Sequence, residues 1–138
     1  MTWLLDTNVI SELRKGSRCD RGVASWRHTA DPSAVFLSVV VVGELRRGVE
    51  LKRHNRDSAS AEALERWLEQ VTATYGSRIL PISTAVADTW GRLNVPNPVP
   101  VIDGLLAATA LVHDLTLVTR NIAHVRRTGA RCLSPFHG

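Results

Sequence analysis

The residues from Thr2 to Ile10 constrain the fold more than any other part of the chain. An apolar run, Trp3-Leu4-Leu5, ends at the acidic residue Asp6, and a helical pattern begins within a few residues of it. This order predicts a buried strand that carries a carboxylate at its carboxyl end and is followed directly by a helix. In open α/β sheets, ligands bind in the crevice beyond the carboxyl ends of the strands. We therefore expect Asp6 to lie in a functional site.

The pattern along the rest of the chain predicts one α/β domain over residues 1–138. The expected strands are 3–5, 35–38, 78–82, 116–119 and 131–133, and the expected helices are 8–15, 20–29, 43–51, 61–71, 84–93, 104–113 and 121–127. Strands that alternate with helices favour a parallel sheet with helices on both faces. The helices 43–51 and 61–71, joined by a polar loop over residues 53–60, are expected to form a hairpin.

Composition indicates which kinds of partner and which compartment suit the chain. The chain has 17 basic and 13 acidic residues, a formal net charge of +4, and 15 of its basic residues are arginines. Arginine binds phosphate groups well, so the chain suits a polyanionic partner, although genome bias is an alternative source of arginine. Cys19 and Cys132 form neither a metal-binding pair nor a disulfide framework, which fits a reducing cytosol. We expect no signal peptide and no membrane span, because a span needs about 18 apolar residues in a row.

Three acidic residues occupy comparable places in this plan. Asp6 ends the first strand, Glu44 lies in the first turns of the helix after the second strand, and Asp103 opens the helix before the fourth strand. Each follows strongly apolar sequence, with no Lys or Arg in the three preceding positions. Because a buried carboxylate is costly without a partner, and clustered acids suit a hard cation, we predict a Mg²⁺ or Mn²⁺ site. Such an ion can activate water and stabilise charge on a phosphoryl group.

Each acid also has a purely structural alternative, which would be favoured if that acid stood alone. Asp6 and Asp103 could be helix N-caps, and Glu44 could stabilise the positive end of a helix. The shared apolar setting of the three favours the joint site. If one metal site holds them, their carboxylate oxygens should lie within roughly 8 Å of one another, given metal–oxygen bonds of about 2.1 Å and paired ions at most about 4 Å apart.

Short motifs that match one known family occur in order along nearly the whole chain. They occupy residues 4–15, 43–49, 90–93, 102–110, 117–121, 128–130 and 134–136. In this order they resemble the PIN-domain ribonucleases of the VapC toxin family, near its FitB-like branch. The resemblance implies a parallel sheet with helices on both faces and a protruding helical hairpin. It also implies a Mg²⁺- or Mn²⁺-dependent endoribonuclease of a type II toxin–antitoxin system, a homodimer, and inhibition by a VapB-like antitoxin that covers the site.

The resemblance assigns roles residue by residue. Asp6, Glu44 and Asp103 fall on the family's catalytic, metal-binding acids. Supporting polar positions are Thr7, Asn8, Thr119 and Asn121. Arg46, Arg47 and Arg120 flank the matched acids, and from this position we expect them to contact RNA or the antitoxin. Glu50 is an alternative ion-pair partner for one of Arg46 and Arg47.

One departure from the family pattern concerns a fourth acid, which is usual shortly after the fourth strand. Here the two candidate positions are Asn121 and His124. Asparagine offers an oxygen without charge, and imidazole is softer than Mg²⁺ prefers, so these residues do not predict a second metal ion. We expect His124 to be a surface residue on a short helix. The alternative function is a catalytically weakened module that binds RNA or an antitoxin without efficient cleavage.

Two other enzyme classes on similar sheets fit the sequence poorly. A haloacid-dehalogenase phosphotransferase needs a second Asp two residues after the first, where this chain has Asn8. A response-regulator receiver needs a second acid beside the first and a Lys after a late strand, where this chain has Arg120.

Overall fold

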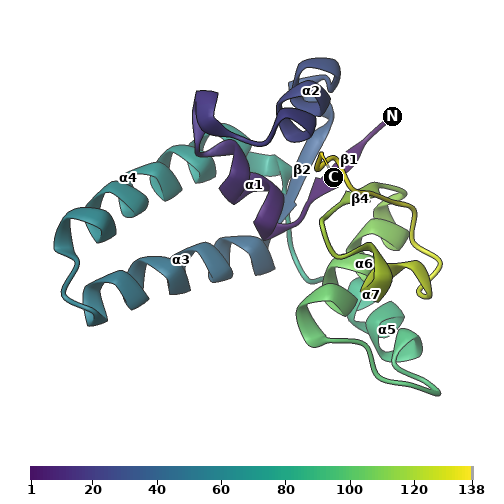
Figure 1. Cartoon of the computed structure of the whole chain (residues 1–138). Coiled ribbons are helices and arrows are strands. Elements are labelled where there is room, and N and C mark those ends of the chain that lie inside the picture. The colour runs from purple at the N-terminus through teal and green to yellow at the C-terminus, as the bar shows by residue number, and fades with distance from the viewer. Residues whose placement is uncertain (138) are drawn as a thin grey trace.

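A parallel sheet forms the centre of the protein in a computed structural model, which describes residues 1–137 (Figure 1). Its strands are β1 (Trp3–Leu5), β2 (Val35–Ser38), β3 (Ile79–Leu80), β4 (Thr116–Val118) and β5 (Cys132–Leu133). The five strands lie in the order β3-β2-β1-β4-β5, and every neighbouring pair is parallel. The chain therefore moves away from β1 on both sides, which makes the carboxyl end of β1 the expected binding crevice.

Helices cover both faces of this sheet, as the sequence predicted. They are α1 (Thr7–Leu13), α2 (Arg21–Thr29), α3 (Val39–His54), α4 (Ser58–Tyr75), α5 (Thr84–Leu93), α6 (Val101–His113) and α7 (Ile122–Arg126), with 3-10 turns at Gly16–Arg18, Pro32–Ala34 and Gly76–Arg78. In Figure 1, α1 and α2 lie on one side of the strands, and α5, α6 and α7 lie on the other. The α3–α4 hairpin extends away from the sheet, so the predicted protruding hairpin is confirmed.

Several predicted boundaries are wrong. The helix expected from residue 43 begins at Val39, because Ser38 caps it by accepting a hydrogen bond from the Val40 amide at 3.0 Å. The loop expected over residues 53–60 spans only residues 55–57, since both flanking helices continue into it. The third strand is Ile79–Leu80 rather than 78–82. The β-branched valines 39–42 look like strand residues, but the cap at Ser38 starts a helix that buries Val41.

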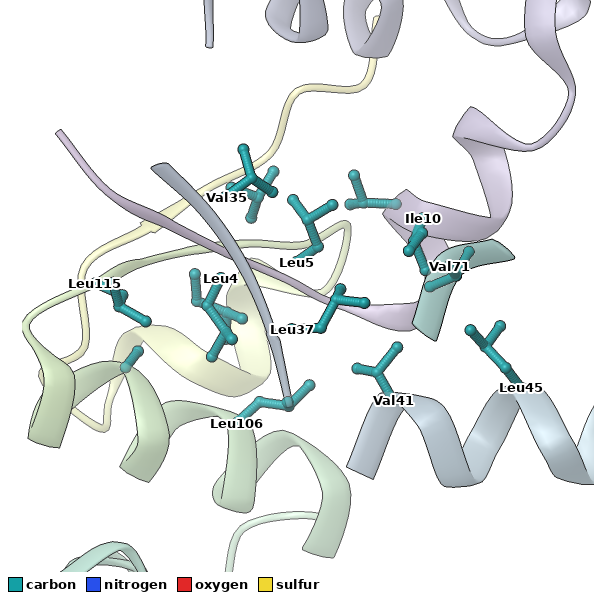
Figure 2. Packing of buried hydrophobic residues seen from close by; sticks show 14 of the residues in the cluster. Leu4, Leu5, Ile10, Val35, Leu37, Val41, Leu45, Val71, Leu106 and Leu115 are labelled. Atoms are coloured by element: carbon teal, nitrogen blue, oxygen red, sulfur yellow. The ribbon is translucent and has the colours of Figure 1, made fainter. Parts of the chain in front are cut away.

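The core packs against both faces of β1. Leu4 and Leu5 are completely buried, on opposite faces of the strand, together with Leu37 and Leu106 from β2 and α6 (Figure 2). Burying each leucine contributes about 1.5–3 kcal/mol. Because both faces of β1 are packed, the strand is held rigidly, and so is the residue that follows it, Asp6.

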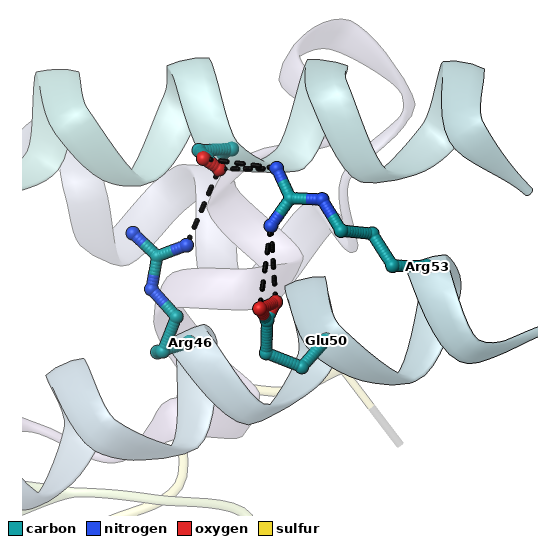
Figure 3. Close-up of polar contacts among 4 residues, drawn as sticks. Arg46, Glu50 and Arg53 are labelled. Carbon is teal, nitrogen blue, oxygen red and sulfur yellow. Dashed lines mark hydrogen bonds and ion pairs between the residues drawn. The ribbon is translucent and has the colours of Figure 1, made fainter.

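Ion pairs link the two helices of the hairpin (Figure 3). Arg53 contacts Glu50 one turn back at 3.0 Å and Glu65 on α4 at 2.5 Å, and Arg46 contacts Glu65 at 3.3 Å. The alternative in which Glu50 pairs with Arg46 or Arg47 is therefore wrong, because Glu50 pairs with Arg53. The network fixes the guanidinium of Arg46 towards α4.

Exposed pairs of this kind are expected to stabilise the hairpin only weakly. Glu65→Gln should lower the melting temperature slightly, and the difference should nearly vanish in about 1 M NaCl, where the screening length is about 3 Å. Glu69→Gln is the control, since Glu69 makes no ion pair among residues 1–137. Thermal unfolding followed by circular dichroism measures both. A difference that persists in high salt would contradict the screened-pair interpretation.

None of the helices described is long and apolar enough to cross a bilayer.

Candidate active site

Asp6 stands at the carboxyl end of β1 and is the best-defined residue of the site. The residue is 4% exposed. One oxygen, Oδ1, accepts a hydrogen bond from the Thr7 amide at 2.7 Å, so Asp6 is also the N-cap of α1. The other oxygen, Oδ2, accepts one from the Thr119 hydroxyl at 2.6 Å. Leu5 pairs with Val118 across β1 and β4, which places the next residues of the two strands opposite each other.

The charge on Asp6 is electrostatically unfavourable where it stands. Burial is the main cause and raises the pKa of its carboxyl group. Hydrogen bonds from Thr119 and Thr7 act in the opposite direction, and the charges of Asp103 and Glu44 add a further increase. The two other predicted acids are therefore near enough to Asp6 to repel it. A desolvated carboxylate beside two more acids is a setting that a cation would stabilise.

Glu44 lies in the second turn of α3 and is half-buried. The Thr7 hydroxyl donates a hydrogen bond to its Oε1 at 2.5 Å. Thr7 thus bridges two of the acids, since its amide binds Asp6 and its hydroxyl binds Glu44. This bridge holds the start of α1 against α3 and aims Glu44 towards the end of β1.

Asp103 lies in the first turn of α6, and its side chain is 13% exposed. The N-cap of α6 is Pro100, so the alternative that Asp103 is a cap is wrong. Its Oδ2 lies 2.9 Å from Nδ1 of His124 on α7. His124 is exposed, as the sequence predicted, but its contact with Asp103 was not predicted. The residue at one fourth-acid position is therefore a partner of Asp103.

The supporting polar residues surround Asp6. The Thr119 hydroxyl, which donates to Asp6, accepts a hydrogen bond from the Asn121 amide at 3.0 Å. The Asn8 side-chain oxygen accepts from the Arg120 amide at 3.3 Å, and its amide nitrogen lies 3.5 Å from Asp6. The Asn121 side chain is exposed and does not cap α7. Thr119 and Asn8 therefore hold the segment after β4 next to Asp6.

The three predicted arginines differ in their availability. Arg120 is exposed directly beside Thr119. Arg47 is exposed on α3 and forms no ion pair within residues 1–137. Arg46 is engaged with Glu65 on the hairpin. Arg120 is thus the predicted arginine whose position is most closely tied to the acids.

The chemistry of the donors fits a hard divalent cation, because carboxylate oxygens from Asp6, Glu44 and Asp103 are what Mg²⁺ and Mn²⁺ prefer. Their side chains do not form a closed shell in this structure. Within residues 1–137, no three His, Cys, Asp or Glu side chains are placed so that they could hold one metal ion together. Oxygens of the acids instead form hydrogen bonds with Thr7, Thr119 and His124. Convergence of the three acids on one ion stays a prediction.

Residues 3–129 match the sequence model of the PIN domain. The chain belongs to the PIN-domain family. It is 33% identical to toxin FitB of Neisseria gonorrhoeae, over 97% of this chain and 98% of FitB. It is 31% identical to VapC ribonuclease Y4jK of Sinorhizobium fredii, over 96% of both chains. A crystal structure of FitAcB from Neisseria gonorrhoeae matches this PIN domain with a TM-score of 0.88 and 31% identity, covering 99% of this chain and 100% of the other.

Sequence reasoning missed three contacts in this PIN domain: Thr7 with Glu44, His124 with Asp103, and the stacking of Arg120 on Phe136. The first two follow from helix packing, which no local pattern reports. The third had a signal, since residues 134–136 were among the family-like motifs, although their role was not assigned.

Proposed function

We propose that this PIN domain is the toxin of a type II toxin–antitoxin pair, a metal-dependent endoribonuclease that cleaves RNA phosphodiester bonds. The observation that carries the proposal is Asp6, a buried carboxylate whose pKa is raised by burial and by its acidic neighbours Asp103 and Glu44. A buried carboxylate such as Asp6 is costly without a basic partner, whereas metal-dependent nucleases use such groups to hold their ions.

The residues of the site would have three separate roles: holding the metal ion, orienting its ligands and binding RNA. Asp6, Glu44 and Asp103 would hold Mg²⁺ or Mn²⁺, which when bound supplies positive charge against phosphoryl oxygens and lowers the pKa of a water molecule. Thr7 orients Glu44, and Thr119 orients Asp6, so that both acids are positioned before substrate arrives. Arg120 and Arg47, both exposed, would bind the phosphate backbone, which is consistent with the net positive charge of the chain.

The named relatives support the biological part of the proposal. FitB is described as a toxin, and Y4jK as a VapC ribonuclease. A further structure, of FitAB bound to an IR36 DNA fragment, matches this chain with a TM-score of 0.83 at 28% identity. By analogy, we expect this chain to form a homodimer and to bind a VapB-like antitoxin that covers the acids.

Cleavage of a single-stranded RNA by the purified chain tests the proposal. We expect cutting in Mg²⁺ or Mn²⁺, complete loss after EDTA, and recovery when the ion is restored. Purification in parallel with an Asp103→Asn variant excludes a contaminating nuclease, because only a cut that depends on this chain will disappear. Cleavage that survives in Asp103→Asn would contradict the assignment of the site.

A second function has one specific observation in its favour. The fourth-acid positions hold Asn121 and His124, and His124 contacts Asp103 instead of adding a negative charge. A chain of this kind could bind RNA or an antitoxin without cutting. Tight RNA binding with no cleavage in either ion, by protein whose fold is intact, would favour this second function.

A further inference from the structure

The last residues of the chain return to the region of β1 and α2 (Figure 1). The His137 amide donates to Asp20 Oδ1 at 2.9 Å, and the same oxygen caps α2 by accepting from the Gly22 and Val23 amides. Position 22 must be glycine, since a Cβ there would overlap the carbonyl oxygen of Pro135. Pro135 itself is buried. The C-terminal tail, residues 134–137, is therefore docked on α2 by specific contacts.

The docked tail presents Phe136 to Arg120. The guanidinium carbon of Arg120 lies 3.8 Å from the centre of the Phe136 ring, which is close stacking. Phe136 is half-buried, whereas Arg120 is exposed. The ring thus covers part of the guanidinium, while Arg120 as a whole remains exposed to solvent. Stacking removes much of the rotamer freedom of a long side chain, so Arg120 is oriented before any ligand arrives.

This stacked pair lies at the edge of the candidate active site. The Arg120 amide donates to Asn8, and the preceding residue, Thr119, donates to Asp6. The unpaired bases of single-stranded RNA stack on aromatic rings and on guanidinium planes. An exposed planar cation, one residue away from a hydroxyl that holds the central acid, has the chemistry to receive such a base.

We propose that Phe136 positions the Arg120 guanidinium as a stacking platform for a base of single-stranded RNA bound across the acids. This inference rests on the proposed function, which provides the RNA. Arg120 contacts the substrate, and Phe136 acts through Arg120. The C-terminal tail is then part of substrate recognition, and RNA with an unpaired base at this position is preferred to a duplex.

Equilibrium binding of two labelled oligonucleotides, measured by fluorescence anisotropy in EDTA, tests the platform without cleavage. One is a single-stranded RNA, and the other is an abasic strand of equal length and charge. Phe136→Leu keeps the apolar contact but removes the ring, and Arg120→Lys keeps the charge but removes the plane. Each should weaken binding of the RNA by about 3- to 30-fold and leave binding of the abasic strand nearly unchanged.

A glycine pair separates tail docking from general damage. Gly22→Ala should displace the tail and reproduce the loss seen in Phe136→Leu. Gly91→Ala is the matched control, because a Cβ at position 91 on α5 meets no atom within 4 Å. Should Gly22→Ala fail to fold, as judged by circular dichroism, the variants at Phe136 and Arg120 decide the matter.

The outcomes distinguish a failure of this inference from a failure of the proposed function on which it rests. If Phe136→Leu binds both oligonucleotides as the wild type does, the platform is overturned, while cleavage by the wild type still supports the nuclease. If the losses for RNA and for the abasic strand are equal, the pair acts only through charge or folding, and the platform is again overturned. If the wild type neither binds nor cuts RNA, the proposed function is overturned and this inference with it.

Discussion

Asp6→Asn is expected to reduce the rate of RNA cleavage by at least about 100-fold, since the variant loses the central charge of the proposed metal site. The fold should survive the change. Asparagine is nearly the same size and is a good helix N-cap. Its side-chain oxygen can still accept the hydrogen bond from the Thr7 amide, and its NH2 group can donate to the Thr119 hydroxyl once that hydroxyl rotates. Cleavage rates at saturating Mn²⁺, measured beside the free energy of unfolding in urea, check both parts.

The same variant should be more stable than the wild type at neutral pH in the absence of metal. Burial raises the pKa of Asp6 in the folded protein above its ordinary value of 3.8. Between these two pKa values the folded state binds more protons than the unfolded state, so wild-type stability falls as pH rises through that interval and remains lower above it. The variant lacks this loss, and its advantage should shrink at acidic pH.

An exposed acid gives the control for this stability effect. Asp88 on α5 has a side chain that is 63% exposed and pairs with Arg92 at 3.1 Å. Asp88→Asn should change neither the cleavage rate nor the pH dependence appreciably. An Asp6→Asn protein that is less stable than the wild type in EDTA at neutral pH would show that the charge of Asp6 is compensated within the fold.

The positions of Asp6 and Glu44 in the fold were predictable because strand ends are visible in sequence. The apolar run before Asp6 and the parallel topology together bring Asp6 opposite Thr119, which follows β4. The same logic placed Glu44 after β2. These predictions rest on periodicity and topology, which depend on local pattern and a few general rules of sheet architecture.

The contacts that were not predicted depend on side-chain geometry between elements that lie far apart in the chain. The bond from Thr7 to Glu44 joins residues 37 positions apart and needs a particular packing of α1 on α3. The bond between Asp103 and His124 likewise depends on how α7 lies on α6. The start of α3 at Val39 was missed for a different reason, because four valines favour a strand and only the cap at Ser38 reverses that preference.

Thr119→Val tests whether the fold holds Asp6 in place through one hydroxyl. Thr119 is completely buried, donates to Asp6 Oδ2 at 2.6 Å and accepts from the Asn121 amide at 3.0 Å. Valine has nearly the same shape but leaves a buried carboxylate oxygen and an amide without this partner. We expect the free energy of unfolding to fall by about 1–3 kcal/mol. Because the Thr119 bond lowers the pKa of Asp6, its removal should raise that pKa further.

The functional consequence of Thr119→Val should exceed the structural one. A side chain that orients a metal ligand typically contributes 10- to 100-fold to metal affinity or activity, so we expect a loss of about that size in Mn²⁺ affinity, measured by calorimetry, and in cleavage rate. Thr119→Ser is the control, since it retains the hydroxyl and removes one methyl group, at a cost of about 1 kcal/mol. Serine should preserve metal affinity although it destabilises the fold. If valine and serine proved equal in metal affinity, the hydroxyl would have no role in holding Asp6, and the carboxylate would be fixed by β1 and its capping of α1 alone.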